Sequence, residues 1–325
     1  MRNLFGAPGD DRPLVALSLL LCGIVVIALQ DALVKLIADQ TSYWQFQTLR
    51  AMGNIIVALL LAIASGGLRL LLPRRFGAVY LRATVMTLCM FCFFSAAPFL
   101  SLSQMAAGLY TYPLFVTLLA GPVLGERVGP WRIGALLLGS AGALVILAPW
   151  RAGFSWMQLL PVLAGFFFAL NVMLIRGACR HENTLAMAFA VALMFLACGV
   201  IGGTTLSLFP LSEALQQTVP YVAIGWPELT LAVIGIGAVT SVLNLSGNLF
   251  MSRAYQTAES SWLAPVDFSY LLFAALWGRV LFDTWPTAHA VAGMALIATA
   301  GVLTSLRERV RRRAAATETT DDSPV

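Results

Sequence analysis

The stretch Pro161-Val-Leu-Ala-Gly-Phe-Phe-Phe-Ala-Leu-Asn-Val-Met-Leu174 decides the fold class, because it is apolar on every face. A lipid-facing strand of a β-barrel would instead alternate in polarity over about ten residues. A transmembrane helix needs about 20 mainly apolar residues, and this stretch supplies most of them. It therefore predicts an α-helix that crosses a bilayer.

The composition extends this interpretation to the whole chain. Of the 325 residues, 59% are hydrophobic and 11% are charged, and the mean hydropathy is +0.85. Soluble domains are about 45–50% apolar and about 25% charged, and a soluble fold cannot hide this much apolar surface. Length alone would suggest two domains, but the charge deficit predicts an all-α, polytopic membrane protein. It excludes soluble enzymes, nucleic-acid binders and disordered scaffolds.

Ten windows are long and apolar enough to span a bilayer. They begin near Leu14, Trp44, Phe76, Leu102, Trp131, Met157, Leu185, Leu229, Ala258 and Pro286, and the last ends near Leu306. We expect a cytoplasmic tail at 1–13, a five-helix repeat at 14–150 and a second five-helix repeat at 151–306. Residues 307–325 are expected to be a cytoplasmic tail, basic then acidic, and disordered by composition.

The lysines and arginines set the expected orientation. With the N-terminus in the cytoplasm, sixteen of the 20 fall on the inner side, and only Arg151 and Arg279 fall on the outer face. We therefore expect both termini on the inside of a bacterial-type inner (plasma) membrane, with an uncleaved signal-anchor as the first span. The net charge of +5 then reflects topology, and no nucleic-acid partner is expected.

Three pairs of segments indicate an internal repeat. Each pair occupies equivalent spans in the two halves: Ala28-Leu-Gln-Asp-Ala-Leu-Val-Lys35 with Ala169-Leu-Asn-Val-Met-Leu-Ile-Arg176, Tyr112-Pro-Leu-Phe115 with Ala264-Pro-Val-Asp267, and Ala141-Gly-Ala-Leu144 with Ala300-Gly-Val-Leu303. Because each half holds five expected spans, the second half crosses in the opposite sense. Inverted repeats of this kind are typical of secondary transporters.

Further motifs are Leu100-Ser-Leu-Ser-Gln-Met-Ala-Ala107, Leu124-Gly-Glu-Arg127 and Ala264-Pro-Val-Asp-Phe-Ser-Tyr-Leu-Leu-Phe-Ala-Ala-Leu-Trp-Gly278. Together with Tyr112-Pro-Leu-Phe115, they resemble the EamA-type members of the drug/metabolite transporter superfamily, over nearly the whole chain. Gln30-Asp-Ala-Leu-Val-Lys35 and Trp44-Gln-Phe-Gln-Thr-Leu-Arg50 are similar to the subgroup that includes S-adenosylmethionine and riboflavin uptake carriers. The resemblance implies ten helices around a central cavity that opens alternately to each side, and it leaves the substrate open.

One segment departs from the family pattern. Phe282-Asp-Thr-Trp-Pro286 stands where relatives usually have Phe-Gly-Glu before a proline. The acidic residue is therefore displaced or lost, and the role of Asp283 or Thr284 is left open.

Charged side chains inside the expected spans are the first candidates for a substrate site, because each costs about 2.5–3.5 kcal/mol to insert. Asp31 and Lys35 share a helix face and could form an ion pair. Arg50 lies about two turns into the second span, with Asn54 one turn deeper. These four could line the outer half of a cavity. Alternatively, Asp31 clamps Arg50 without meeting substrate, and Lys35 snorkels to the interface.

Asp267 is the strongest single candidate, with Tyr270 three residues on. A carboxylate there could pair with a cationic substrate group or take up a transported proton, as Asp31 could. The alternative is a hydrogen-bonded structural carboxyl group. Asn244 and Asn248 are four apart and present their amides together, for substrate or for helix–helix bonding.

Aromatic rings and prolines complete the predicted site. Tyr112 and Trp262, with Tyr110 and Tyr270, could stack on a planar ligand, although packing explains such rings as well. Pro113 and Pro265 would break their helices and mark a gating region, because freed carbonyl groups need a cavity or a neighbour.

We find no basis for catalysis or for a cofactor. The sequence holds no Walker A, HExxH or GxSxG motif, and its five cysteines imply no metal site or disulfide framework. We expect a secondary transporter of a small organic metabolite (amino-acid-like, nucleoside-like or vitamin-like) that works by alternating access in the lipid bilayer. The substrate gradient or proton coupling would supply the energy. An integral-membrane group-transfer enzyme and a non-transporting sensor are the alternatives, and the oligomeric state is open.

Overall fold

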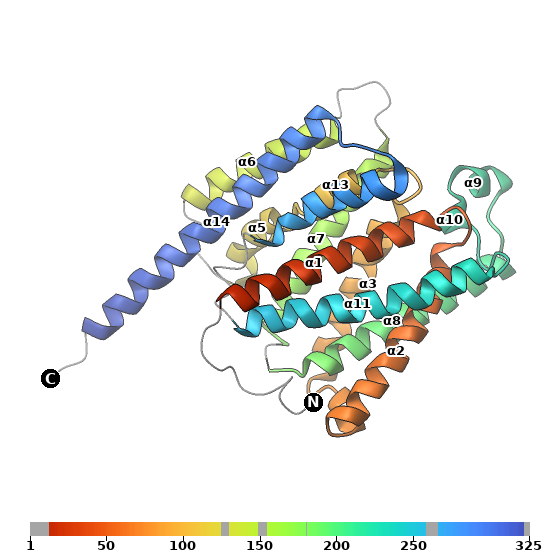
Figure 1. Cartoon of the computed structure of the whole chain (residues 1–325), viewed down its shortest axis with the longest axis horizontal. Coiled ribbons are helices and arrows are strands. Elements are labelled where there is room, and N and C mark those ends of the chain that lie inside the picture. Colours follow the sequence, from red (N-terminus) through yellow and green to blue (C-terminus); the bar gives the residue numbers. More distant parts are fainter. Residues whose placement is uncertain (1–12, 125–129, 149–154, 180, 258–265, 322–325) are drawn as a thin grey trace.

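The computed structural model describes residues 13–124, 130–148, 155–179, 181–257 and 266–321. Across these ranges the chain forms helices and no strand (Figure 1). The elements are α1 (Pro13–Leu36), α2 (Tyr43–Ser65), η2 (Leu68–Leu71), α3 (Phe76–Ser95), α4 (Leu102–Leu109), α5 (Tyr112–Leu124), α6 (Pro130–Leu147), η3 (Trp156–Leu159), α7 (Leu160–Arg176), α8 (Thr184–Leu208), α9 (Glu213–Thr218), α10 (Pro220–Ala223), α11 (Leu231–Thr257), α13 (Ser269–Phe282) and α14 (Ala288–Asp321).

Six helical segments of the described chain are long and apolar enough to cross a membrane. They lie in α1, α2, α3, η3 with α7, α8 and α11, and shorter apolar segments lie in α6, α13 and α14. Residues such as Leu60, Ile63 and Leu272, more than half exposed on these helices, would face lipid. The predicted class, an all-helical multi-pass membrane protein, is confirmed.

The helices pack in matched pairs. α1 lies along α11, and α3 lies along α7; α2 packs on α8, and α6 packs on α14. Small residues allow the closest approaches, because only they let two backbones meet in a lipid environment. A Cβ built on Gly142 of α6 would lie 2.8 Å from the carbonyl oxygen of Gly293 in α14, so this pair tolerates no larger residue without movement.

Six of these helices form two groups of three. One group contains α1, α2 and α11, and the other contains α3, α7 and α8; the largest contact between them is that of α2 with α8. α4 and α13 pack on each other. α4 also packs on α7, and α13 also packs on α1. The cavity described below lies between the two groups.

The expected fourth span is not one continuous helix. α4 ends at Leu109 and α5 begins at Tyr112, and Ser101 and Gln104 form a capping box at the start of α4. Pro113 is the second residue of α5, where its missing N–H costs no hydrogen bond. The helix is therefore interrupted at Tyr110 and Thr111, just before the proline.

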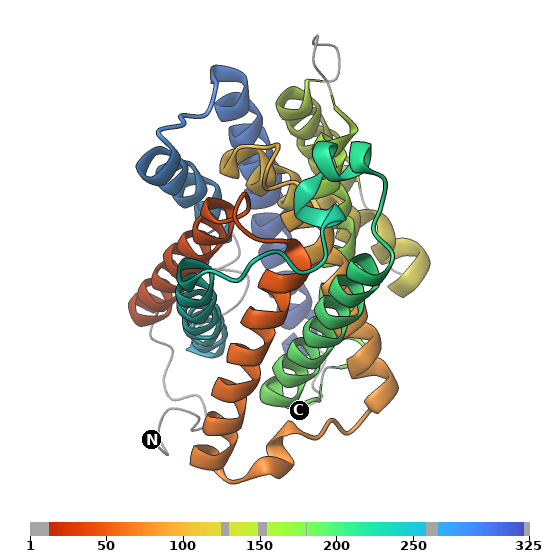
Figure 2. The same ribbon diagram turned by 90° about the vertical axis from the view of Figure 1, so that its right-hand side faces the viewer.

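The connection from α8 to α11 runs from residue 209 to residue 230. It holds α9 and α10 and folds across one end of the bundle (Figure 2). The Ser42 hydroxyl donates to the Gly225 carbonyl at 2.6 Å, and the Gln45 amide donates to the Pro227 carbonyl at 2.7 Å. The start of α2 therefore holds this segment in place.

Two further features concern helix ends. α14 continues through most of the expected disordered tail to Asp321, along residues rich in the good helix formers Arg, Ala and Glu. At the end of α13, Asp283 adopts a left-handed conformation (φ 53°), its N–H bonds to the Arg279 carbonyl, and its carboxylate pairs with the Arg279 side chain. Here the displaced acidic residue terminates a helix.

Candidate functional site

A cavity lies between the two helix groups, and its empty space, open solvent included, is about 890 Å³. Ionisable side chains from separate elements reach its wall: Asp31 from α1, Arg50 from α2, and Asp267 just before α13. Asp31 is 7% exposed and Arg50 is 1% exposed, so both are in a low-dielectric interior beside the cavity. Charges survive in such a place when a cavity, a partner or a function compensates them.

A chain of hydrogen bonds runs across one wall of this cavity and joins three helices. Asn248 donates to the Asn244 carbonyl at 2.7 Å, and the Asn244 side chain donates to Gln30 at 2.7 Å. Gln30 in turn donates to the Asp31 carboxylate at 2.8 Å, and the Tyr270 hydroxyl donates to the other carboxylate oxygen at 2.5 Å. The network fixes Asp31 from both sides and presents amide groups to the cavity.

Tyrosine rings form another part of the wall. Tyr110 stacks on Tyr270 at 5.1 Å with an interplanar angle of 12°, and it contacts Tyr112 edge-on at 5.9 Å. Tyr112 meets Phe168 of α7 edge-on at 4.9 Å. Tyr110 sits in the break between α4 and α5, so the break places aromatic rings at the cavity.

The partners of the charged residues differ from those that we expected. Among the described residues, Asp31 forms no ion pair with either Lys35 or Arg50, and it bonds Gln30 and Tyr270 instead. Lys35 donates to the Ala97 carbonyl and lies 5.4 Å from the centroid of the Phe282 ring. Helical spacing shows which residues share a face, but a partner on another helix can compete.

Of the predicted site residues, seven line the cavity: Asp31, Arg50, Tyr112, Asn244, Asn248, Asp267 and Tyr270. Asn54 does not. It lies one turn beyond Arg50, where α2 approaches α11 closely. A Cβ added to the neighbouring Gly53 would lie 2.3 Å from the hydroxyl oxygen of Ser241 in α11. α11 thus closes the space that Asn54 was expected to line. Trp262 and Pro265 lie outside the described residues.

Sequence reasoning missed the apolar part of the wall, which includes Ile24, Met86, Met90 and Phe168. No signal in the sequence separates these from other apolar residues in spans. Gln30 could have been identified, because it is an amide in an apolar span beside Asp31.

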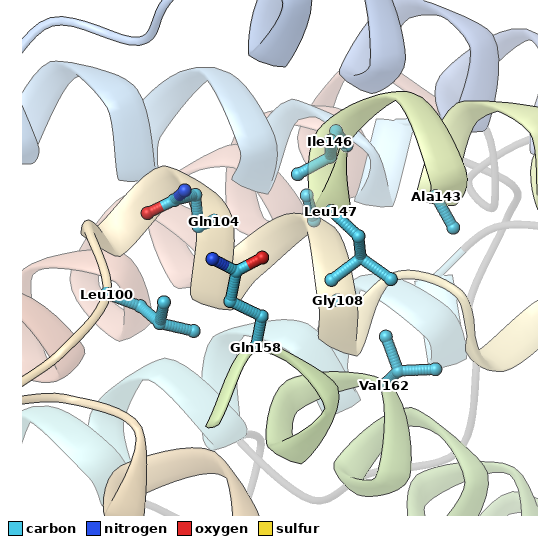
Figure 3. Close-up of a pocket in the computed structure, with 9 residues that line it drawn as sticks. Leu100, Gln104, Gly108, Ala143, Ile146, Leu147, Gln158 and Val162 are labelled. Atoms are coloured by element: carbon cyan, nitrogen blue, oxygen red, sulfur yellow. The ribbon is translucent and has the colours of Figure 1, made fainter. Parts of the chain in front are cut away.

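A smaller cavity of about 290 Å³ lies between α4, α6 and α7 (Figure 3). Gln104 and Gln158 are its polar residues, and Gln104 already accepts the Ser101 N–H at 3.0 Å. No charged side chain lines it, so it lacks the groups that single out the larger cavity. The described residues also contain no group of three or more side chains that could hold a metal ion.

Comparisons with known proteins agree with the sequence resemblance. Residues 14–148 match the model of the EamA-like transporter family. The riboflavin transporter of Rhizobium johnstonii is 29% identical over 210 residues, 65% of this chain and 64% of that protein. The riboflavin transporter of Vibrio cholerae is 31% identical over 194 residues, 60% of this chain and 59% of that protein. The chain thus spans less than two thirds of both.

A longer match joins the chain to the pseudopaline exporter of Pseudomonas aeruginosa, with 27% identity over 262 residues, 78% of this chain and 83% of that protein. A solved crystal structure covers 90% of this chain and 99% of its own, with a TM-score of 0.56 and 20% identity, which supports the fold alone. These relatives are named as transporters and exporters rather than enzymes. Residues 14–148 thus resemble the EamA-like transporter family, and the longer matches are to proteins named as transporters or exporters.

Proposed function

We propose that this protein is a secondary transporter that carries a small organic metabolite across a bacterial inner membrane by alternating access. The observation that carries the proposal is the cavity between the two helix groups, which collects Asp31, Arg50 and Asp267 from separate elements. The seven predicted site residues that line the cavity become, in this proposal, part of its substrate-binding wall.

The architecture that we propose is ten transmembrane helices in two inverted repeats, residues 14–150 and 151–306. In this architecture α1, α2, α3 and α6 of the first repeat correspond to α7, α8, α11 and α14 of the second. The α1–α11 contact then corresponds to the α7–α3 contact, and the α2–α8 and α6–α14 contacts each join a helix to its own counterpart. This is the pattern that a two-fold axis in the membrane plane would produce. α1 begins and α14 ends toward the same end of the bundle (Figure 1), which supports both termini on one side.

The proposed movement is a rocking of one three-helix group against the other. Within the groups α1 lies along α11 and α3 lies along α7, and the main contact between the groups is that of α2 with α8. A tilt about that contact would open the cavity first to one side and then to the other. Asp267 or Asp31 would bind a cationic group of the substrate, or a proton when transport is coupled to the proton gradient.

The substrate class that we favour is a planar, vitamin-like metabolite. Tyr110, Tyr112, Tyr270 and Phe168 supply rings around the amide groups of the network, and such walls suit flat heterocycles. Two relatives are riboflavin transporters, and riboflavin is therefore the first substrate to test. Amino-acid-like and nucleoside-like substrates are the next.

The test is uptake into proteoliposomes that contain the purified full-length protein. Wild-type protein should accumulate riboflavin or another metabolite found by thermal-shift screening, since a ligand of the native state raises its apparent stability. Asp267→Asn should reduce uptake at least about tenfold, the effect of about 1.4 kcal/mol. Asp283→Asn is the matched control, because that carboxylate is 86% exposed at a helix end. Equal uptake in both variants would remove Asp267 from the mechanism, and no uptake of any ligand would refute transport.

A further inference from the structure

Arg50 is a buried cation with few acceptors. Its side chain is 1% exposed, and of its five N–H donors one bonds within the described chain, Nη2 to Gln47 Oε1 at 2.9 Å. Its Nε is buried without an acceptor. No carboxylate of the described residues lies within ion-pair distance, because Asp31 is bonded to Gln30 and Tyr270 instead. The guanidinium group therefore has donors to spare beside a cavity.

Its surroundings fix the position of the guanidinium group. The rings of Phe94, Phe195 and Phe46 lie 5.1, 5.3 and 5.9 Å from its carbon, within the range of cation–π attraction. The backbone carbonyl of Arg50 accepts the Ser241 hydroxyl of α11 at 3.1 Å. The cation is thus held in place before any ligand arrives, which reduces the ordering cost of binding.

A second donor stands next to it. Gln47, one turn back on α2, is fully buried, and its side-chain nitrogen makes no hydrogen bond. Its oxygen is occupied by Arg50, so the amide turns its donor end away from the guanidinium group. The Arg50 guanidinium group and the Gln47 amide thus hold unsatisfied donors one turn apart on α2, and a ligand with more than one acceptor oxygen suits such a pair.

We propose that Arg50, supported by Gln47, binds a carboxylate of the transported molecule. The inference rests on the proposed transport function and narrows its cargo to planar metabolites with a carboxylate; riboflavin has none, so it serves as the non-acidic member of the uptake screen. A carboxylate matches the planar fork of a guanidinium group and can accept two parallel hydrogen bonds. The apolar wall formed by Met86, Met90 and Phe93 leaves room beside that group for a hydrophobic or aromatic body.

Benzoate and benzamide test this inference, because they share size and ring but differ in charge. The full-length protein in detergent should unfold about 2–4 °C higher with benzoate at saturating millimolar concentration than with benzamide. Arg50→Gln should abolish the difference between the two probes. Arg279→Gln, which removes an exposed arginine, should preserve it. Equal shifts in the wild type, or a benzoate shift that persists in Arg50→Gln, would overturn the inference.

A second variant covers the case in which Arg50→Gln does not fold. Arg50→Lys retains the positive charge but loses the fork, so the benzoate shift should fall by half or more without disappearing. An unchanged shift would refute the bidentate contact. The thermal shift measures binding independently of transport. Proteoliposomes that take up no metabolite would therefore refute the transport function while a benzoate shift through Arg50 would still identify an anion site.

Discussion

Replacement of Arg50 by methionine should abolish transport and leave the stability of the empty protein almost unchanged. Insertion of a charged group at the centre of a bilayer costs about 2.5–3.5 kcal/mol. In return, the three phenylalanine rings supply about 2 kcal/mol of cation–π attraction, and the bond to Gln47 supplies about 1 kcal/mol. These contributions nearly cancel. Methionine has a similar length and no charge, so we expect a change of less than about 1 kcal/mol in the free energy of unfolding.

A structural ion pair predicts a different result. Removal of one partner of a buried pair typically costs about 3–5 kcal/mol, because the other charge is left uncompensated. Asp31 keeps two donors, Gln30 and Tyr270, when Arg50 is gone, and this is why we expect no such loss.

The measurement is equilibrium unfolding in mixed detergent micelles, followed by circular dichroism, with uptake assayed on the same preparation. Arg279→Met serves as the control and should change neither quantity. A loss of more than about 3 kcal/mol in Arg50→Met would show that the arginine stabilises the fold and would refute the reasoning. Retained uptake would refute its role in cargo binding.

Further outcomes follow from the packing and from the network. Gly202→Ala should cost about 1–3 kcal/mol and slow uptake, because its new Cβ would lie 2.1 Å from an indole ring at the α2–α8 contact; Gly235→Ala, with open space around it, should be neutral or stabilising in the same unfolding assay. Tyr270→Phe removes one donor to Asp31 and should lower the free energy of unfolding by about 1–2 kcal/mol. The uptake rate should fall by at least the factor to which that free energy corresponds. Glu182→Ala removes the acceptor of two backbone N–H groups at the start of α3, so amide hydrogen exchange there should accelerate without a change in substrate affinity; exchange as slow as in the wild type would contradict that capping role.

The charged residues of the site could be predicted from the sequence because charged side chains are rare in apolar spans. Asp31, Arg50 and Asp267 stand out in apolar spans, and the cost of burying each makes a cavity the expected surrounding. The structure brings all three to one cavity. Their partners could not be predicted in the same way. Spacing along one helix predicted Asp31 with Lys35, whereas the distances between helices, set by packing, placed Asp31 beside Tyr270.

The parts of the fold that the sequence left out are those governed by contacts between distant segments. The segment from 209 to 230 has no strong pattern of its own, and it is held by Ser42, Gln45 and Trp44, about 180 positions earlier in the chain. The apolar side of the cavity has the same origin, because Met86 and Phe168 differ from other span residues only in the direction that packing gives them.

The two ends of the bundle carry matching contacts, and these bear on the proposed movement. At one end Ser42, just before α2, and Gln45, in its first turn, bind the segment that leads into α11. At the other end Glu182, in front of α8, binds the backbone of Arg74 and Arg75, which lead into α3. Each contact therefore lies within one three-helix group and stiffens it. If transport rocks these groups as rigid bodies, both contacts persist in every state, and the strain of the movement falls on the α2–α8 contact between them.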